Sequence, residues 1–183
     1  IREAAKFLIP LLKEQINELK GDSSDFRKAF NLWKINESST LKILASSSRR
    51  VEVVEPEEVL AKFTYYKFIG KIIFYLTLAE NLSGKVAKLE LTEPKDTKKQ
   101  LNFFFSQAQK IDYQAVFEID FTDDIEFNAS VDKLVFRLVE VFNEFDFKVL
   151  PSSVIGNILE NLVPSEEKQK FGQYFTPESL ALL

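Results

Sequence analysis

The stretch AKFTYYKFIGKIIFYLTLAENL, residues 61–82, is the most apolar part of the chain, and its pattern decides the fold class. Lysines interrupt it every four or five residues, at Lys62, Lys67 and Lys71. A membrane-spanning helix needs about 20 residues that are nearly free of charge, so these lysines argue against a span. The opposite side of a helix would carry Phe63, Tyr66, Ile69, Ile73 and Leu76. The pattern predicts one long amphipathic core helix from Pro56 to Leu82.

Helical spacing of apolar residues recurs on both sides of this stretch. It predicts further helices over residues 2–20, 25–35, 98–110, 130–145, 151–162 and 164–171. Pro10 lies inside the first of these, so we expect a kink there or two shorter helices. Residues 21–24, Gly-Asp-Ser-Ser, predict the end of one helix and the cap of the next, and we expect Ser130 to cap the helix that it begins.

Two segments lack a helical period. Residues 38–50 are ambiguous and are interpreted as a loop, and residues 112–127 alternate apolar and acidic side chains, which favours a loop or a short strand. Together the segments predict an all-α fold, mainly helical, with at most one short strand pair. We expect a helical N-terminal domain over residues 1–148 and a helical connector over residues 149–183.

The composition excludes several kinds of site. The 183 residues include no Cys, no His and no Met, and only 5 Gly. Disulfides, Cys/His zinc sites and histidine-based catalysis are therefore absent, and we expect neither a metal site nor a catalytic residue. The N-terminus shows no signal peptide, so we expect a cytoplasmic protein. Because residue 1 is not Met, we expect further residues upstream.

Charge is distributed unevenly along the chain. Residues 1–115 carry 19 basic and 15 acidic side chains, whereas residues 116–183 carry 5 and 13. The connection after the long helix contains Lys85, Lys88, Lys95, Lys98 and Lys99. With the lysines of the long helix, these side chains are predicted to form the most positive face and to contact DNA phosphates. The alternative interpretation is a solvated loop with no partner.

The stretch FGQYFTPESLALL, residues 171–183, has the features of a helix start. Thr176 is a favoured N-cap and Pro177 a favoured first helical residue. Tyr174 and Phe175 precede them, next to backbone N–H groups that suit an anion. These features suit a binding wall for a small nucleoside with a carboxylate. They suit equally an ordinary helix start whose two aromatic residues lie in a core.

Residues 155–177, IGNILENLVPSEEKQKFGQYFTP, resemble a segment of adenine-N6 DNA methyltransferases from type I and type IIG restriction-modification systems. In that family a helix of the form G-x-(I/L)-Y-E-x-L precedes a short charged helix and G-Q-(F/Y)-(Y/F)-T-P, the S-adenosylmethionine-binding motif X. Residues 172–177 match motif X throughout, and Gly156, Glu160 and Leu162 match the first helix. Leu159 stands where Tyr is common, and Lys168 where Arg is common. Upstream similarity is looser and reaches back over about the last 130 residues.

The resemblance implies a function for the protein as a whole. Methyl transfer from S-adenosylmethionine to adenine N6 in double-stranded DNA is expected, with Tyr174, Phe175, Thr176 and Pro177 at the cofactor. The glycine-bearing cofactor motif and the catalytic N-P-P-(Y/F) are not in this chain, so we expect both downstream of Leu183. The resemblance also implies a specificity or nuclease domain or subunit as a partner.

Two other functions remain open on sequence alone. The chain could be a helical protein-interaction module with no nucleic-acid role. A small-molecule sensor built on the Phe-rich core is the third hypothesis, since the chain has 18 Phe.

Overall fold

The computed structural model describes residues 2–38, 55–82, 84–111, 113–114 and 116–149. Its helices are α1 (Arg2–Asp22), α2 (Ser24–Asn36), α4 (Pro56–Asn81), α5 (Thr97–Gln109) and α6 (Ala129–Asn143), with a short 3-10 helix, η1 (Phe121–Asp124). No strand occurs within this part of the chain, which confirms the all-α prediction. None of the helices that the structure describes has the length and apolar character needed to cross a bilayer.

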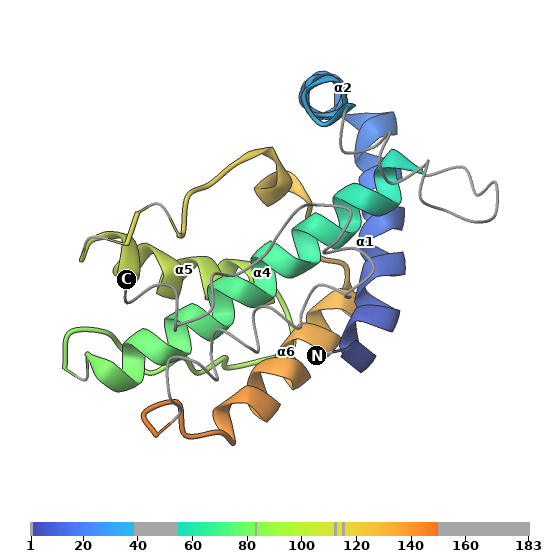
Figure 1. Cartoon of the computed structure of the whole chain (residues 1–183). Helices are drawn as coiled ribbons and strands as arrows, with labels where there is room; N and C mark the ends of the chain where they lie inside the picture. The colour runs from blue at the N-terminus through green and yellow to red at the C-terminus, as the bar shows by residue number, and fades with distance from the viewer. Residues whose placement is uncertain (1, 39–54, 83, 112, 115, 150–183) are drawn as a thin grey trace, which may run out of the picture.

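Helix α4 runs through the middle of the fold, with α1, α5 and α6 packed against it (Figure 1). The prediction of this helix is confirmed almost to the residue, but the prediction that it is amphipathic is wrong. No residue from Pro56 to Glu80 is exposed, and Lys71 is buried together with Ile72 and Ile73. A helix that is apolar nearly all round can be covered on every side, and its lysines meet acidic partners there.

Helix α1 lies along α4 and buries Leu8, Leu12 and Ile16. It is one continuous helix through Pro10, so of the two expected alternatives, a kink or two shorter helices, the second is wrong. Proline removes one backbone hydrogen bond from a helix interior. Pro10 lies on the exposed side, where water can satisfy the carbonyl that loses its partner.

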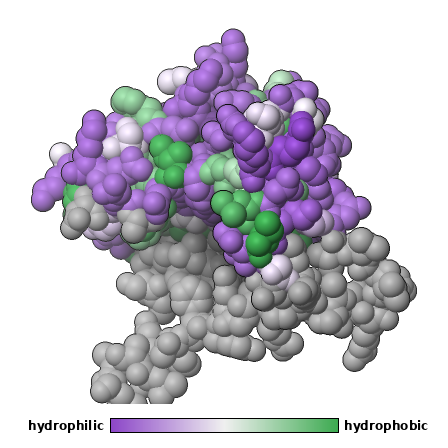
Figure 2. Space-filling view, turned by 90° about the horizontal axis from the view of Figure 1, so that it is seen from above, coloured by the Kyte–Doolittle hydropathy of each residue, from purple (hydrophilic) through white to green (hydrophobic). Residues whose placement is uncertain are grey.

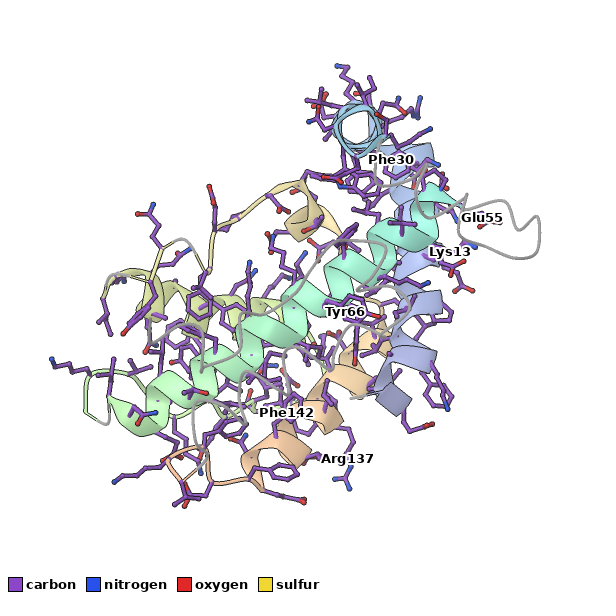
Figure 3. All side chains as sticks on the ribbon, in the orientation of Figure 1. Lys13, Phe30, Glu55, Tyr66, Arg137 and Phe142 are labelled. Carbon is purple, nitrogen blue, oxygen red and sulfur yellow. The ribbon has the colours of Figure 1, made fainter. Side chains whose placement is uncertain are left out.

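Ion pairs connect α1 to the start of α4. Lys13 lies beside Glu55, as Figure 3 shows, and Lys20 pairs with Glu57. Both glutamates are at the N-terminus of α4, where negative charge is favourable for the helix dipole. Further along the fold, the side chain of Phe142 lies between α6 and α4, whereas Arg137 points away from the helices (Figure 3).

Two of the described α-helices start with a side-chain cap from their own N-cap residue. Ser23 caps α2 by accepting a hydrogen bond of 3.2 Å from the backbone N–H of Phe26, in the segment where a cap was predicted. The cap of α6 is Asn128 and not Ser130, so that prediction is wrong. Asn128 has an extended backbone, and its Oδ1 accepts from the N–H groups of Ser130 and Val131, each at 3.0 Å. Ser130 already lies inside the helix, where its own N–H needs an acceptor.

Residues 116–127 form a loop that contains η1, in agreement with the loop alternative. The side chains of Phe117 and Ile125 are 1% exposed and anchor the two ends of this loop in the core. The predicted loop at residues 38–50 lies almost wholly outside the described residues. The predicted helices at 151–162 and 164–171 lie outside them entirely.

Candidate functional site

The five lysines predicted to contact DNA differ in their surroundings. Lys85, Lys88, Lys95 and Lys99 are exposed, and Lys98 is buried. Lys88 pairs with Glu90 at 3.1 Å and Lys99 pairs with Asp96 at 3.0 Å. Acidic neighbours therefore offset part of the positive charge of this connection, and the structure does not gather the five lysines on one surface.

The Lys98 side chain points inward from the second residue of α5. Its Nζ donates to the carbonyl oxygen of Ile125 at 2.7 Å and also to that of Asp123, and it lies 5.8 Å from the ring centre of Phe127. Burial lowers the pKa of Lys98, although acidic residues of the loop oppose this effect. Lys98 thus holds the end of η1, where backbone carbonyls lack helical partners.

Two lysines of α4 reach the same loop. Lys67 Nζ lies 2.9 Å from Asp120 Oδ2 and 3.0 Å from Asp123 Oδ2. Lys71 Nζ lies 3.6 Å from Asp123 Oδ1 and donates to the Glu118 carbonyl at 3.0 Å. Because residues four apart share a face of a helix, α4 presents both ammonium groups to one short segment.

We call Lys67, Lys71 and Lys98 the lysine cluster, and residues 118–125 the acidic loop. Lys62 is not part of the cluster, since it pairs with Glu58 of α4 itself at 3.2 Å. The cluster draws on two helices that are separated by the polar connection. It brings three cations together around atoms of a single loop.

The electrostatic balance differs between the members of the cluster. Burial disfavours the charge of Lys67, but hydrogen bonds to Asp120 and Asp123 outweigh this effect and hold its pKa above the ordinary value. Burial lowers the pKa of Lys71 in spite of the nearby Asp123 carboxylate. The charge of Lys67 is therefore well compensated, whereas the Asp123 carboxylate offsets only part of the effect of burial on Lys71.

The arrangement can bind anions, and its chemistry goes no further than that. Ammonium groups donate hydrogen bonds and supply positive charge, and carboxylates are the anions that they meet here. No group of three acidic side chains able to hold a metal ion occurs among the residues that the structure describes. The lysine cluster is thus an anion-binding site, and the acidic loop supplies the carboxylates and carbonyl oxygens that it binds in this structure.

Sequence reasoning did not connect Asp120 and Asp123 with the lysines of α4. The available signal was the presence of Lys67 and Lys71 in the most apolar stretch of the chain. Buried lysines need acceptors, and residues 118–126 are the most acidic stretch of the described chain. The predicted cofactor residues, Tyr174 to Pro177, lie outside the described residues.

Comparisons with protein-family models, with curated proteins and with solved structures find no match for this chain. The site is therefore interpreted from its own geometry and from the sequence.

We expect acid to weaken the attachment of the acidic loop. Burial opposes ionisation of Asp120, but hydrogen bonds from Thr122 and Lys67 outweigh it, so its pKa lies below 3.8 in the folded protein. A lowered pKa contributes stability above the unfolded value of 3.8, and this stability is lost as pH falls through the folded pKa. Wild type should therefore lose more unfolding free energy than Asp120→Asn as pH falls from about 5 to below 3.8.

Urea titrations of both proteins across this range measure the difference. Asp25→Asn is the control, because Asp25 is an exposed aspartate paired with Lys28. Parallel pH profiles for wild type and Asp120→Asn would show that the Asp120 carboxylate does not stabilise the folded loop.

Proposed function

We propose that this chain is the helical N-terminal region of a site-specific DNA methyltransferase that transfers a methyl group from S-adenosylmethionine to adenine N6. The observation that carries the proposal is the match of residues 172–177, GQYFTP, to motif X of that family. The all-α fold of the described residues supports it, because the resemblance implies a helical domain ahead of the catalytic one.

In this proposal the chain supplies one wall of the cofactor pocket. Proline restricts φ and threonine is a favoured N-cap, so the pair Thr176 and Pro177 would shape this loop before the ligand arrives. A loop that is already shaped loses less entropy on binding. Phe175 contributes apolar contact to the cofactor, with Tyr174 beside it.

The remaining chemistry belongs to residues downstream of Leu183 in the whole enzyme. The target adenine leaves the duplex and enters the catalytic pocket, where its exocyclic amine is methylated. The helical region would lie against the DNA that flanks this base. The cytoplasm is the compartment that this function requires, and a specificity or nuclease domain or subunit is the partner that would select the site.

The cofactor wall is tested by calorimetric titration of the whole enzyme with S-adenosylmethionine. The double variant Phe175→Ala, Thr176→Ala should bind at least about tenfold more weakly, since it loses ~1–2 kcal/mol of apolar contact together with the cap. Phe145→Ala is the control, because Phe145 is an exposed aromatic of the helical domain. Residues 1–183 alone should not bind the cofactor measurably, because the opposite wall is absent.

Two results would contradict this assignment. Unchanged affinity in the double variant would show that residues 171–183 are an ordinary helix start. Tight binding by residues 1–183 alone would show that the pocket is complete without downstream residues. Adenine N6 methylation of duplex DNA by the whole enzyme, read from the modified base, tests the reaction itself.

A helical protein-interaction module remains the second candidate. The observation that favours it is a set of large apolar side chains on the surface: Phe7, Leu32, Ile35, Phe103, Val116, Ile119, Phe145 and Val149. On the face that Figure 2 shows, however, apolar residues form small separate groups among hydrophilic ones. Stable protein interfaces need larger continuous patches, so this candidate ranks below the methyltransferase.

A further inference from the structure

We infer that the lysine cluster is a phosphate-binding site that the acidic loop masks. In the unbound protein Asp120 and Asp123 occupy the position that a DNA phosphate takes when DNA displaces the loop. The assignment to DNA rests on the proposed function, whereas the phosphate site itself follows from the geometry.

The ammonium groups of the lysine cluster converge on one short segment of the chain. The Nζ atoms of Lys67, Lys71 and Lys98 make all the hydrogen bonds and ion pairs that they form here with residues 118–125. Two carboxylates and three carbonyl oxygens thus surround ammonium groups from two helices. A phosphate group offers the same chemistry, since it is an anion with several oxygen acceptors.

Two lysines of the cluster are buried, which is unfavourable for their charge. Lys71 is 5% exposed and Lys98 is 8% exposed. Burying a lysine ammonium has a large desolvation penalty, and apolar residues of similar volume are often equally stable or more stable in such positions. Stability therefore gives a weak reason for these lysines, and a ligand that needs their charge gives a stronger one.

The acidic loop has few buried apolar contacts between its two anchors. Between the anchors Phe117 and Ile125 no side chain is fully buried, and the half-buried Phe121 packs on the core residue Phe26 of α2, with ring centres 5.8 Å apart. Segments with few buried apolar contacts open at the lowest free energies in a protein. The part from 118 to 124 can therefore move away while both anchors stay in the core.

The segment that covers the lysine cluster is strongly acidic. Residues 118–126 contain Glu118, Asp120, Asp123, Asp124 and Glu126. While the loop covers the cluster, its carboxylates repel DNA and neutralise the lysines. Displacement frees Lys67 and Lys71, leaves Lys98 on the Ile125 carbonyl, and moves negative charge away from the site, so DNA binding gains from both changes.

The test is DNA binding by the whole protein, measured by fluorescence anisotropy with a duplex at several salt concentrations. The double variant Asp120→Asn, Asp123→Asn should bind at least about tenfold more tightly than wild type at low salt. Its dependence of log K on log salt should be steeper by about 1–2, since each phosphate contact adds about 0.9. Adding Lys67→Gln to this variant should remove most of the gain.

A matched variant separates the site from net charge. Glu3→Gln with Asp25→Asn removes the same two charges from exposed carboxylates that pair with Lys6 and Lys28. It should bind DNA at most about threefold more tightly than wild type, with a nearly unchanged slope. An equal gain in the two double variants would overturn the inference.

Amide hydrogen exchange measures the opening of the loop in the wild-type protein, so this test does not depend on the folding of a variant. The backbone N–H groups of Asp120, Thr122 and Asp123 donate hydrogen bonds inside the loop, to Asp123 Oδ2 at 2.9 Å, Asp120 Oδ1 at 2.8 Å and the Asp120 carbonyl at 2.9 Å. They should exchange several-fold faster in the presence of DNA, while amides of α6 remain unchanged. Equal or slower exchange would show that DNA leaves the loop in place.

A second probe separates failure of this inference from failure of the proposed function. Inorganic tripolyphosphate should bind the Asp120→Asn, Asp123→Asn variant more tightly than the matched variant. If tripolyphosphate shows this gain and DNA does not, the phosphate site stands and the DNA assignment falls. If neither probe shows it, the inference falls, and the cofactor titration still tests the methyltransferase independently.

Discussion

Replacing Asp132 by alanine is expected to lower the free energy of unfolding by about 3 kcal/mol. The Asp132 carboxylate is 5% exposed and accepts from the Thr97 N–H at 2.9 Å, the Thr97 hydroxyl at 2.6 Å and the Asp96 N–H at 3.0 Å. These donors are at the N-terminus of α5, where backbone N–H groups have no partner within the helix. Alanine would leave them buried without an acceptor.

The backbone of Asp96 adds to this expectation. Asp96 has φ 49, the left-handed conformation, and its own side chain does not cap α5. Such a conformation persists in a residue other than glycine only where neighbouring groups hold it. Asp132, from α6, supplies both the cap and the hold. Its loss should therefore loosen the connection between α4 and α5 as well as the helix end.

Urea unfolding measures the effect, and two further variants define its origin. Asp132→Asn keeps the shape and one acceptor oxygen, so it should lose about half as much stability as the alanine variant. Asp25→Ala removes an exposed aspartate and should change stability by at most about 0.5 kcal/mol. A loss below about 1 kcal/mol in Asp132→Ala would show that water replaces the carboxylate at little cost.

Replacing Phe117 by alanine is expected to cost about 3–5 kcal/mol of unfolding free energy. The Phe117 ring is 1% exposed, and its centre lies 5.1 Å from that of Phe105, 5.9 Å from Phe74 and 6.3 Å from Tyr75. Alanine would open a cavity among these rings and remove their favourable edge contacts. Because Phe117 also anchors the acidic loop, amides in residues 118–124 should exchange faster than those of α6.

Phe103→Ala is the matched control, because Phe103 is 63% exposed on α5. It should change stability by at most about 0.5 kcal/mol. A small loss in both variants would indicate that the aromatic core collapses around the missing ring. Faster exchange everywhere in the Phe117 variant would mean that the loop is not a separate unit from the helices.

The two stability predictions and the masked phosphate site concern the same region of the molecule. Asp132 fixes the start of α5, which positions Lys98, and Phe117 fixes one end of the acidic loop. If the loop opens when DNA binds, the anchors Phe117 and Ile125 must stay in the core while residues 118–124 move. The Phe117 variant should therefore unmask the lysines partly and bind DNA more tightly than the Phe103 variant, although its fold is weaker.

For the part of the chain that the structure describes, the amino-acid sequence was enough to predict the five α-helices, with bounds within two residues of those observed. Helical spacing is a local property, so the stretch 61–82 was sufficient to predict α4, and the turn before Phe26 was sufficient to place a cap. The resemblance of residues 155–177 is also a property of sequence alone, and the cofactor residues that it implies lie outside the described structure.

Which charges are buried, and which partners they have, follows from the packing of the helices and the acidic loop in three dimensions. Lys67 and Lys71 looked like the solvated side of an amphipathic helix, but their acceptors lie about fifty residues further along the chain, in the acidic loop. Lys98 looked like one lysine of a polar connection, and Asp132 like an ordinary acidic residue near a helix start. Each is buried because a partner from another element compensates its charge or its donors. Such pairing depends on how helices meet in space, and no periodicity within a single segment records it.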